Sequence, residues 1–284
     1  MRILKKLEDA LDYKSTIIKA KLIKTEGSVP RETGTYMLIS SKYIFGSIGG
    51  GQLEFDIINK SKNILEKNTI FKEQIINIPL GPAIGQCCGG YTQIKITKHK
   101  NGKECFLNEK KINDNFENLY VFGAGHIGRE ICMKSIDLDF NINLIDSRED
   151  FIKNKIHKKV TNIFAKYPWL IVKNLPKNSY FLVLTHSHSH DFNIINELLN
   201  YNNYKFAGLI GSKTKMKRFQ NRLLKLNHDI SKINNIECPI GIKSITSKKP
   251  PQIAISIIAR LLEFRSNFLN KRKNSNIFLK KINE

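Results

Sequence analysis

The chain has 284 residues, of which 41% are hydrophobic, and its formal net charge is +22. This length suffices for two domains with their own cores, and no apolar run approaches a membrane span, so we expect a cytoplasmic protein without a signal peptide and without membrane contact. The lysines are spread along the chain and are not interleaved with aromatic residues, which argues against nucleic-acid binding despite the charge.

Five cysteines are present, and their spacing forms neither a disulfide framework nor a C-x-x-C metal motif. In a cytoplasmic protein we expect all of them to be reduced thiols. They are Cys87, Cys88, Cys105, Cys132 and Cys238.

The first part of the chain, residues 1–98, predicts a small α+β domain. Helical spacing of apolar residues indicates helices at 3–11 and 52–67. Strands are predicted at 16–24, 35–40, 43–45, 70–78 and 91–97. Residues 99–118 are polar and aperiodic, which marks a linker.

The turn Gln86-Cys-Cys-Gly-Gly90 is the least ordinary loop of this domain. Adjacent cysteines do not readily bridge each other, and the two glycines leave the backbone open, so at least one thiol should be accessible to a ligand. The alternative is that one thiol is buried as a small hydrophobic side chain. Its place in a glycine-bounded turn favours a chemical role for Cys87 or Cys88.

Two other glycine-rich turns precede the cysteine turn in the sequence. Residues 26–34 place Arg31 between two strands, where its guanidinium suits a phosphate or carboxylate, or equally a surface ion pair. The turn Ile48-Gly-Gly-Gly51 leads into a helix with Glu54 in its first turn. Such a turn suits an anion cradle of backbone N–H groups, or it is a simple hairpin exit.

A G-x-G-x-x-G turn, Gly123-Ala-Gly-His-Ile-Gly128, follows a predicted strand at 119–122. A helix is predicted at 127–136, and a second strand, 141–146, ends on Asp146. This order is typical of a Rossmann-like unit that binds a nucleotide or phosphate. The alternative is a unit that has kept its packing and lost its ligand.

Each motif residue has an expected role. Gly123 would permit the tight turn, Gly125 would let a diphosphate approach the backbone, and Gly128 would let the helix pack on the strand. Free N–H groups at the start of the helix would favour a phosphate, and Asp146 would accept a hydrogen bond from a ribose hydroxyl.

Strands alternate with helices in the remainder of this domain, which predicts a parallel sheet with ligands at the carboxyl ends of its strands. The expected strands are 180–185 and 205–210, and the expected helices are 192–199, 213–226 and a last one opened by Pro250-Pro251. We assign the domain to 119–265 and a solvated basic tail to 266–284.

Three histidines follow the first of these strands, in Thr185-His-Ser-His-Ser-His-Asp191. If the strand continued, His186, His188 and His190 would share one face and offer metal ligands at alternate positions. The run is similar to the H-x-H-x-D-H of metallo-β-lactamase-like hydrolases. The aspartate stands in the wrong place for that class, because it follows the third histidine.

Several motifs occur in an order that resembles the xanthine dehydrogenase accessory proteins of the XdhC/CoxI family, over roughly residues 10–265. They are Gly27-Ser-Val-Pro-Arg31, Gly49-Gly-Gly-Gln-Leu-Glu54, Gln86-Cys-Cys-Gly-Gly90, Gly123-Ala-Gly-His-Ile-Gly128, Thr185-His-Ser-His188, Gly208-Leu-Ile-Gly-Ser212 and Ile253-Ala-Ile-Ser256. Two positions depart from the family pattern. His190 occupies a position where the family pattern has an apolar residue, and Thr246-Ser247 replaces what is often a glycine.

The resemblance implies a homodimeric maturation factor rather than a turnover enzyme. Such a factor binds molybdenum cofactor, supports its sulfuration with a cysteine desulfurase as sulfur donor, and hands it to the large subunit of a molybdenum hydroxylase such as xanthine dehydrogenase. A soft metal dithiolene suits a thiolate of Cys87 or Cys88, as a catalytic group or a molybdenum contact. The cofactor-binding residues would be Arg31, Gln86, Gly89, Gly90, Gly123, Gly125, His126, Gly128, Asp146, His186 and His188.

Two other classes remain open. One is an NAD(P)-dependent oxidoreductase, for which Asp146 favours NAD and Arg148 would accommodate the 2′-phosphate of NADP, with His126 or His186 as general acid. The other is a non-catalytic scaffold that docks the hydroxylase. For the carrier we expect the cysteine turn and the edge carrying Gly125 to contribute to one pocket.

Overall fold

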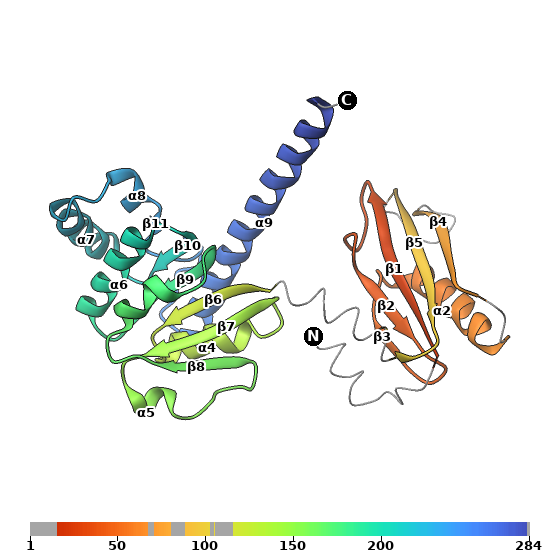
Figure 1. The fold of residues 1–284 in the computed structure, drawn as a ribbon, viewed down its shortest axis with the longest axis horizontal. Helices are drawn as coiled ribbons and strands as arrows, with labels where there is room; N and C mark the ends of the chain where they lie inside the picture. The colour runs from red at the N-terminus through yellow and green to blue at the C-terminus, as the bar shows by residue number, and fades with distance from the viewer. Residues whose placement is uncertain (1–15, 68–70, 81–88, 103–104, 106–115, 283–284) are drawn as a thin grey trace. The chain divides into compact units, whose positions relative to one another are not determined.

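The computed structural model describes residues 16–67, 71–80, 89–102, 105 and 116–282, with side chains up to residue 268. The chain divides into two compact units, Met1–Asn115 and Phe116–Glu284. Figure 1 shows a sheet and a helix in the first unit and a sheet between helices in the second.

In its described residues, the N-terminal unit has an antiparallel sheet packed against the helix α2 (Gly51–Glu66). The strand order is β3-β2-β1-β5-β4. The strands are β1 (Ile17–Glu26), β2 (Tyr36–Ile39), β3 (Ile44–Gly46), β4 (Glu73–Leu80) and β5 (Gly90–His99). Alternate residues of β1 and β5 are buried, and they meet Leu53 and Ile57 of α2 in the core, as expected for a sheet with one covered face.

The C-terminal unit has a parallel sheet in the order β11-β10-β9-β6-β7-β8. The strands are β6 (Glu117–Phe122), β7 (Phe140–Asp146), β8 (Val160–Phe164), β9 (Ser179–Val183), β10 (Tyr204–Leu209) and β11 (Ile236–Glu237). From β8 this is the order 3-2-1-4-5-6 of the doubly wound dinucleotide-binding fold. The order reverses between β6 and β9, which places the ligand crevice at their carboxyl ends.

Helices cover both faces of this sheet, and β6 alternates between the two cores. Leu119 and Val121 pack with the helices α4 (His126–Lys134) and α9 (Pro250–Ile282). Tyr120 and Phe122 face the opposite core. That core includes α6 (His188–Tyr201), α7 (Lys213–Lys225), α8 (Ile230–Asn234) and the 3₁₀ segment η2 (Pro168–Asn174), while α5 (Glu149–Ile152) follows β7.

The predicted fold class, an α+β domain followed by a Rossmann-like domain with a parallel sheet, is confirmed. One difference is at the C-terminus, where α9 continues to Ile282 through the stretch expected to be a tail. No glycine or proline stands between Pro251 and Ile282 to stop a helix. The helix predicted at 3–11 lies outside the described residues.

Candidate functional site

The glycine turn sits at the crossing point of the C-terminal sheet. A Cβ on Gly123, whose φ is +119°, would lie 2.2 Å from the carbonyl oxygen of Leu184, the residue after β9. A Cβ on Gly128 would lie 1.9 Å from the oxygen of Gly123. Both positions therefore exclude a side chain, because the contacts are with backbone. A Cβ on Gly125 would meet nothing within 4 Å, so this residue borders open space.

The start of α4 carries no cap of its own. Gly125 is the N-cap residue, no side chain accepts a hydrogen bond there, and the first turn contains no acidic residue. By contrast, Ser187 caps α6 and Ser212 caps α7. The uncapped N–H groups and the helix dipole make this end of α4 favourable for an anion.

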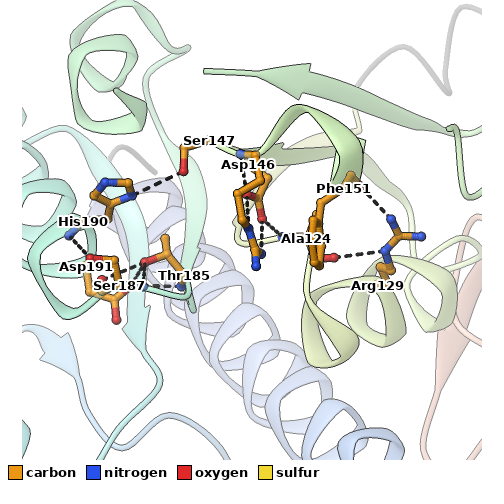
Figure 2. Close-up of polar contacts among 10 residues, drawn as sticks. Ala124, Arg129, Asp146, Ser147, Phe151, Thr185, Ser187, His190 and Asp191 are labelled. Atoms are coloured by element: carbon orange, nitrogen blue, oxygen red, sulfur yellow. Dashed lines mark hydrogen bonds and ion pairs between the residues drawn. The ribbon is translucent and has the colours of Figure 1, made fainter. Parts of the chain in front are cut away.

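Asp146, the expected ribose ligand, is buried and fully engaged (Figure 2). Its Oδ2 accepts hydrogen bonds from the Ala124 N–H at 2.6 Å and from Arg148 Nη2 at 2.9 Å. Its Oδ1 accepts from the Arg148 N–H at 2.9 Å and from Arg148 Nε at 3.0 Å. The expectation that this carboxylate is available to a ribose is therefore not met in this conformation, because protein donors already occupy it.

The pKa of Asp146 follows from these contacts. Burial alone would raise it, but the hydrogen bonds from Arg148 and from the backbone N–H groups of Ala124 and Arg148 outweigh burial, and the pKa lies below its usual value. Asp146 is therefore ionised at neutral pH, and it ties the end of β7 to the glycine turn.

Arg129, which sequence reasoning missed, braces the same turn from α4. Its Nε donates to the Ala124 oxygen at 3.0 Å and its Nη2 to the Phe151 oxygen at 2.6 Å (Figure 2). No local signal marks this role, because both partners are backbone oxygens and one lies in the next helix.

The histidine segment is not a continued strand. β9 ends at Val183, Ser187 caps α6, and His188 opens that helix, so the three histidines do not share a strand face. Ser and Asp close to a helix start favour this ending over a longer strand. Among the residues that the structure describes, no group of three or more His, Cys, Asp or Glu side chains is arranged to hold a metal ion.

A buried ion pair fixes the start of this segment. Asp191 Oδ1 accepts hydrogen bonds from the Thr185 N–H at 2.9 Å and from Thr185 Oγ1 at 2.7 Å. Asp191 Oδ2 pairs with Lys215 Nζ at 2.6 Å, and the two side chains are 2% and 11% exposed. Lys215, also missed from the sequence, donates in addition to the Ile210 oxygen, so α6, α7 and the ends of β9 and β10 are tied together.

His190 lies between aromatic neighbours. Its ring is 5.2 Å from that of Trp169 and 5.3 Å from that of His186, and Nδ1 is 3.4 Å from Ser147 Oγ. Burial, with a smaller contribution from His186, lowers its pKa below the usual value, against the opposing influence of Asp191 and Asp146.

This shift predicts an acid-sensitive contribution to stability. Because the folded state favours neutral His190, its contribution is present above the unfolded-state pKa of about 6.5 and is lost as the pH falls through the lower folded-state value. We expect His190→Gln to reduce the loss of unfolding free energy between pH 7 and pH 5 in urea titrations. An unchanged pH dependence would contradict the assignment.

An open cleft of about 450 Å³ connects the glycine turn to the histidine segment. It is lined by Gly125, His126, Ile127, Gly128, Arg148, Phe151, Leu184, Thr185, His186, Ile210 and Pro250. The predicted residues Gly125, His126, Gly128 and His186 thus line one cleft, whereas Gly123 and Asp146 lie beneath it and His188 is exposed on α6.

In the N-terminal unit, three glycine turns meet. Ser28 forms a bridge with Gly89, and a Cβ on Gly90 would lie 2.2 Å from the Ser28 oxygen. A Cβ on Gly49 would lie 2.6 Å from Pro30 Cγ. The motifs beginning at residues 27 and 49 and the end of the cysteine turn therefore lie together.

The expected anion cradle at Gly49–Gly51 already holds an anion of the protein itself. Glu54 Oε2 accepts hydrogen bonds from Ser47 Oγ at 2.7 Å and from the N–H groups of Ile48 and Gly50, each at 3.1 Å. A capping interaction thus replaces the external ligand considered from the sequence. Arg31 is exposed and lines a separate hollow with Tyr36.

Gln86, Cys87 and Cys88 lie outside the described residues, so their role and the expected joint pocket stay predictions. The three described cysteines, Cys105, Cys132 and Cys238, are free thiols. Burial raises the pKa of the Cys132 thiol to about 12, which suits a packing role.

The strand order and the glycine turn define the C-terminal unit as a Rossmann-type domain, joined to a smaller α+β domain. Residues 119–261 match the model of the XdhC Rossmann domain, and residues 14–72 match that of the XdhC and CoxI family. The chain belongs to the XdhC and CoxI family, as its motifs predicted.

Two curated relatives are similar in sequence. An uncharacterized Escherichia coli protein, YqeB, is 25% identical over 251 residues, which cover 87% of this chain and 43% of YqeB. A Bacillus subtilis protein, named as a probable subunit of xanthine dehydrogenase, is 28% identical over 149 residues, 52% of this chain and 42% of that protein. The chain thus spans less than half the length of the curated relatives it matches.

A crystal structure from Bacillus halodurans, described as a xanthine dehydrogenase, has the same fold. It superposes with a TM-score of 0.77 at 17% identity and covers 94% of this chain and 96% of the other. In the part of the chain that the structure describes, no helix combines the length and apolar character needed to cross a membrane.

Proposed function

We propose that this protein is an accessory factor for xanthine dehydrogenase or a related molybdenum hydroxylase. It binds the molybdenum cofactor, supports its sulfuration with a cysteine desulfurase, and delivers it to the hydroxylase large subunit. The observation that carries the proposal is the uncapped start of α4, open to a cleft, in a chain of the XdhC and CoxI family. The Bacillus subtilis relative's name adds support.

The residues present suit the phosphate of such a cofactor. Gly125 leaves space for a phosphate at the backbone, and the first-turn N–H groups of α4 supply donors. His126 and His186 line the same cleft and would contact the rest of the ligand. When bound, the cofactor supplies the soft metal dithiolene, for which Cys87 or Cys88 offers a thiolate.

The protein's part in this function is to bind, orient and protect the cofactor. The ties of Asp146 to Ala124 and of Asp191 to Thr185 hold both sides of the cleft in place before a ligand arrives. We place this function in the cytoplasm and in a homodimer, as the family resemblance implies.

The test is the molybdopterin content of protein purified from cells able to make the cofactor. We expect Gly125→Ala to lower the content roughly tenfold, because a methyl group would occupy the space next to the backbone donors. Replacing both Cys87 and Cys88 with alanine should lower it as well. Cys238→Ala, which removes a half-buried thiol that does not line the cleft, is the matched control and should leave the content unchanged.

Undiminished cofactor in the double cysteine variant would remove these thiols from binding and leave them at most a role in sulfur transfer. An undiminished molybdopterin content in Gly125→Ala would mean that the cofactor does not bind at the start of α4.

The strand order also favours a second candidate, an NAD(P)-dependent oxidoreductase. Separate calorimetric titrations with NAD, NADP and molybdopterin discriminate between the two. Tight dinucleotide binding without pterin affinity would favour the oxidoreductase.

A further inference from the structure

The residue that would select NAD in this fold has no free acceptor position. An ionised carboxylate has about four lone-pair sites. Asp146 uses four, for one hydrogen bond from Ala124 and three from Arg148, and its side chain is 1% exposed. A ribose diol could bind Asp146 only by displacing Arg148 from a charge-assisted, bidentate pair.

Arg148 is held in place from two sides. Asp146 binds its Nε and Nη2, and the guanidinium carbon stands 3.7 Å from the centre of the Phe151 ring. Its side chain is still 32% exposed and lines the cleft. Nη1 makes no hydrogen bond or ion pair with the described residues, so a donor pair of a fixed cation remains available.

The charged groups of the cleft also favour a ligand with a phosphate. None of its described lining residues is an aspartate or glutamate, and Arg148 shares the lining with His126 and His186. Asp146 neutralises Arg148, but it is 1% exposed and does not line the cleft, so the guanidinium is the charged group that a ligand in the cleft would meet, and its N–H donors suit the oxygens of a phosphate.

We propose that the Asp146–Arg148 pair determines ligand specificity. It keeps the adenosine ribose of NAD out of the cleft, and through Nη1 of Arg148 it selects a ligand with a phosphomonoester. Both the 2′-phosphate of NADP and the terminal phosphate of a pterin cofactor carry this group. The inference rests on the proposed function in one respect, since it takes the cleft at α4 as the ligand site.

The test is calorimetric titration of the full chain with NAD and NADP, which differ only in the 2′-phosphate. We expect NADP to bind at least about tenfold more tightly than NAD, the effect of one charge-assisted contact. Arg148→Gln should remove this preference. Arg148→Lys keeps the charge beside Asp146 but loses the planar fork, and it should weaken the preference as well.

Arg222→Gln is the matched control. Its guanidinium also stands 3.7 Å from a ring centre, that of Phe192, but Arg222 does not line the cleft. This variant should keep the full preference for NADP. Equal affinity for NAD and NADP in the wild type, or a preference that survives in Arg148→Gln, would overturn the inference.

If neither dinucleotide binds, the ligand that supplies the phosphomonoester is the pterin cofactor. Inorganic phosphate, at constant ionic strength, should then raise the Tm of the wild type and of Arg222→Gln but not that of Arg148→Gln. Equal shifts in all three would also overturn the inference. Failure of the proposed function can be distinguished from failure of this inference. It would appear as an absence of molybdopterin from the purified protein, whether or not phosphate shifts the Tm.

Discussion

Replacing Gly123 with alanine is expected to remove about 3–5 kcal/mol from the free energy of unfolding of the C-terminal unit. The new methyl group would stand 2.2 Å from the Leu184 oxygen, and the residue would have to keep a φ of +119°. Neither strain can relax through a side-chain rotation, since the opposing atoms are backbone. Urea unfolding monitored by circular dichroism measures the loss.

Gly125→Ala is the control for this prediction. The substitution is the same and lies two residues away, but its φ of −71° is ordinary and its methyl group meets nothing within 4 Å. Its unfolding free energy should stay within about 0.5 kcal/mol of the wild type while ligand binding falls. Equal stability of the two variants would mean that the backbone around Gly123 accommodates a methyl group at a lower cost than its contacts indicate.

Lys215→Met is expected to destabilise the C-terminal unit by about 3–5 kcal/mol. The methionine preserves most of the side-chain volume, but Asp191 would be left as a buried carboxylate without its cation. Asp191 also positions Thr185, next to His186 at the cleft, so ligand affinity should fall with stability. Thermal and urea unfolding measure the first effect, and titration the second.

A surface ion pair provides the comparison. Lys134 pairs with Glu130 one helical turn away, and both side chains are about one third exposed. Lys134→Met should therefore cost under about 1 kcal/mol. Adding Asp191→Asn to Lys215→Met should recover part of the loss, because the uncompensated charge is then gone. A double variant less stable than Lys215→Met would contradict this explanation.

The fold could be predicted where periodicity extends over enough residues. Alternation indicated β1, and helical spacing indicated α2 and α7. Shorter elements were missed: α5 has 4 residues and β11 has 2, so neither shows a period. These elements exist because the sheet and its neighbours hold them.

The candidate site was predictable in its glycines but not in its ion pairs. The motif places Gly125 and His126 at the cleft, because strand, turn and helix are consecutive in sequence. The Lys215–Asp191 pair joins two helices, and only the tertiary fold brings it together. Asp146 was recognised as important, but its occupation by Arg148 depends on side-chain conformation, which no spacing reveals.

The glycine turns at Gly49–Gly51 and at Gly123–Gly128 differ in which other elements must fold before each turn can form. Glu54 reaches its partners Ser47, Ile48 and Gly50 within the same short segment, so that turn can take shape as soon as α2 does. The turn at Gly123 closes against Leu184, a distant part of the chain, and we expect it to be completed only after β9 has joined the sheet. Ligand-binding competence in the C-terminal unit should thus be a late event of folding, and a nascent chain released before β9 would carry the motif without its cleft.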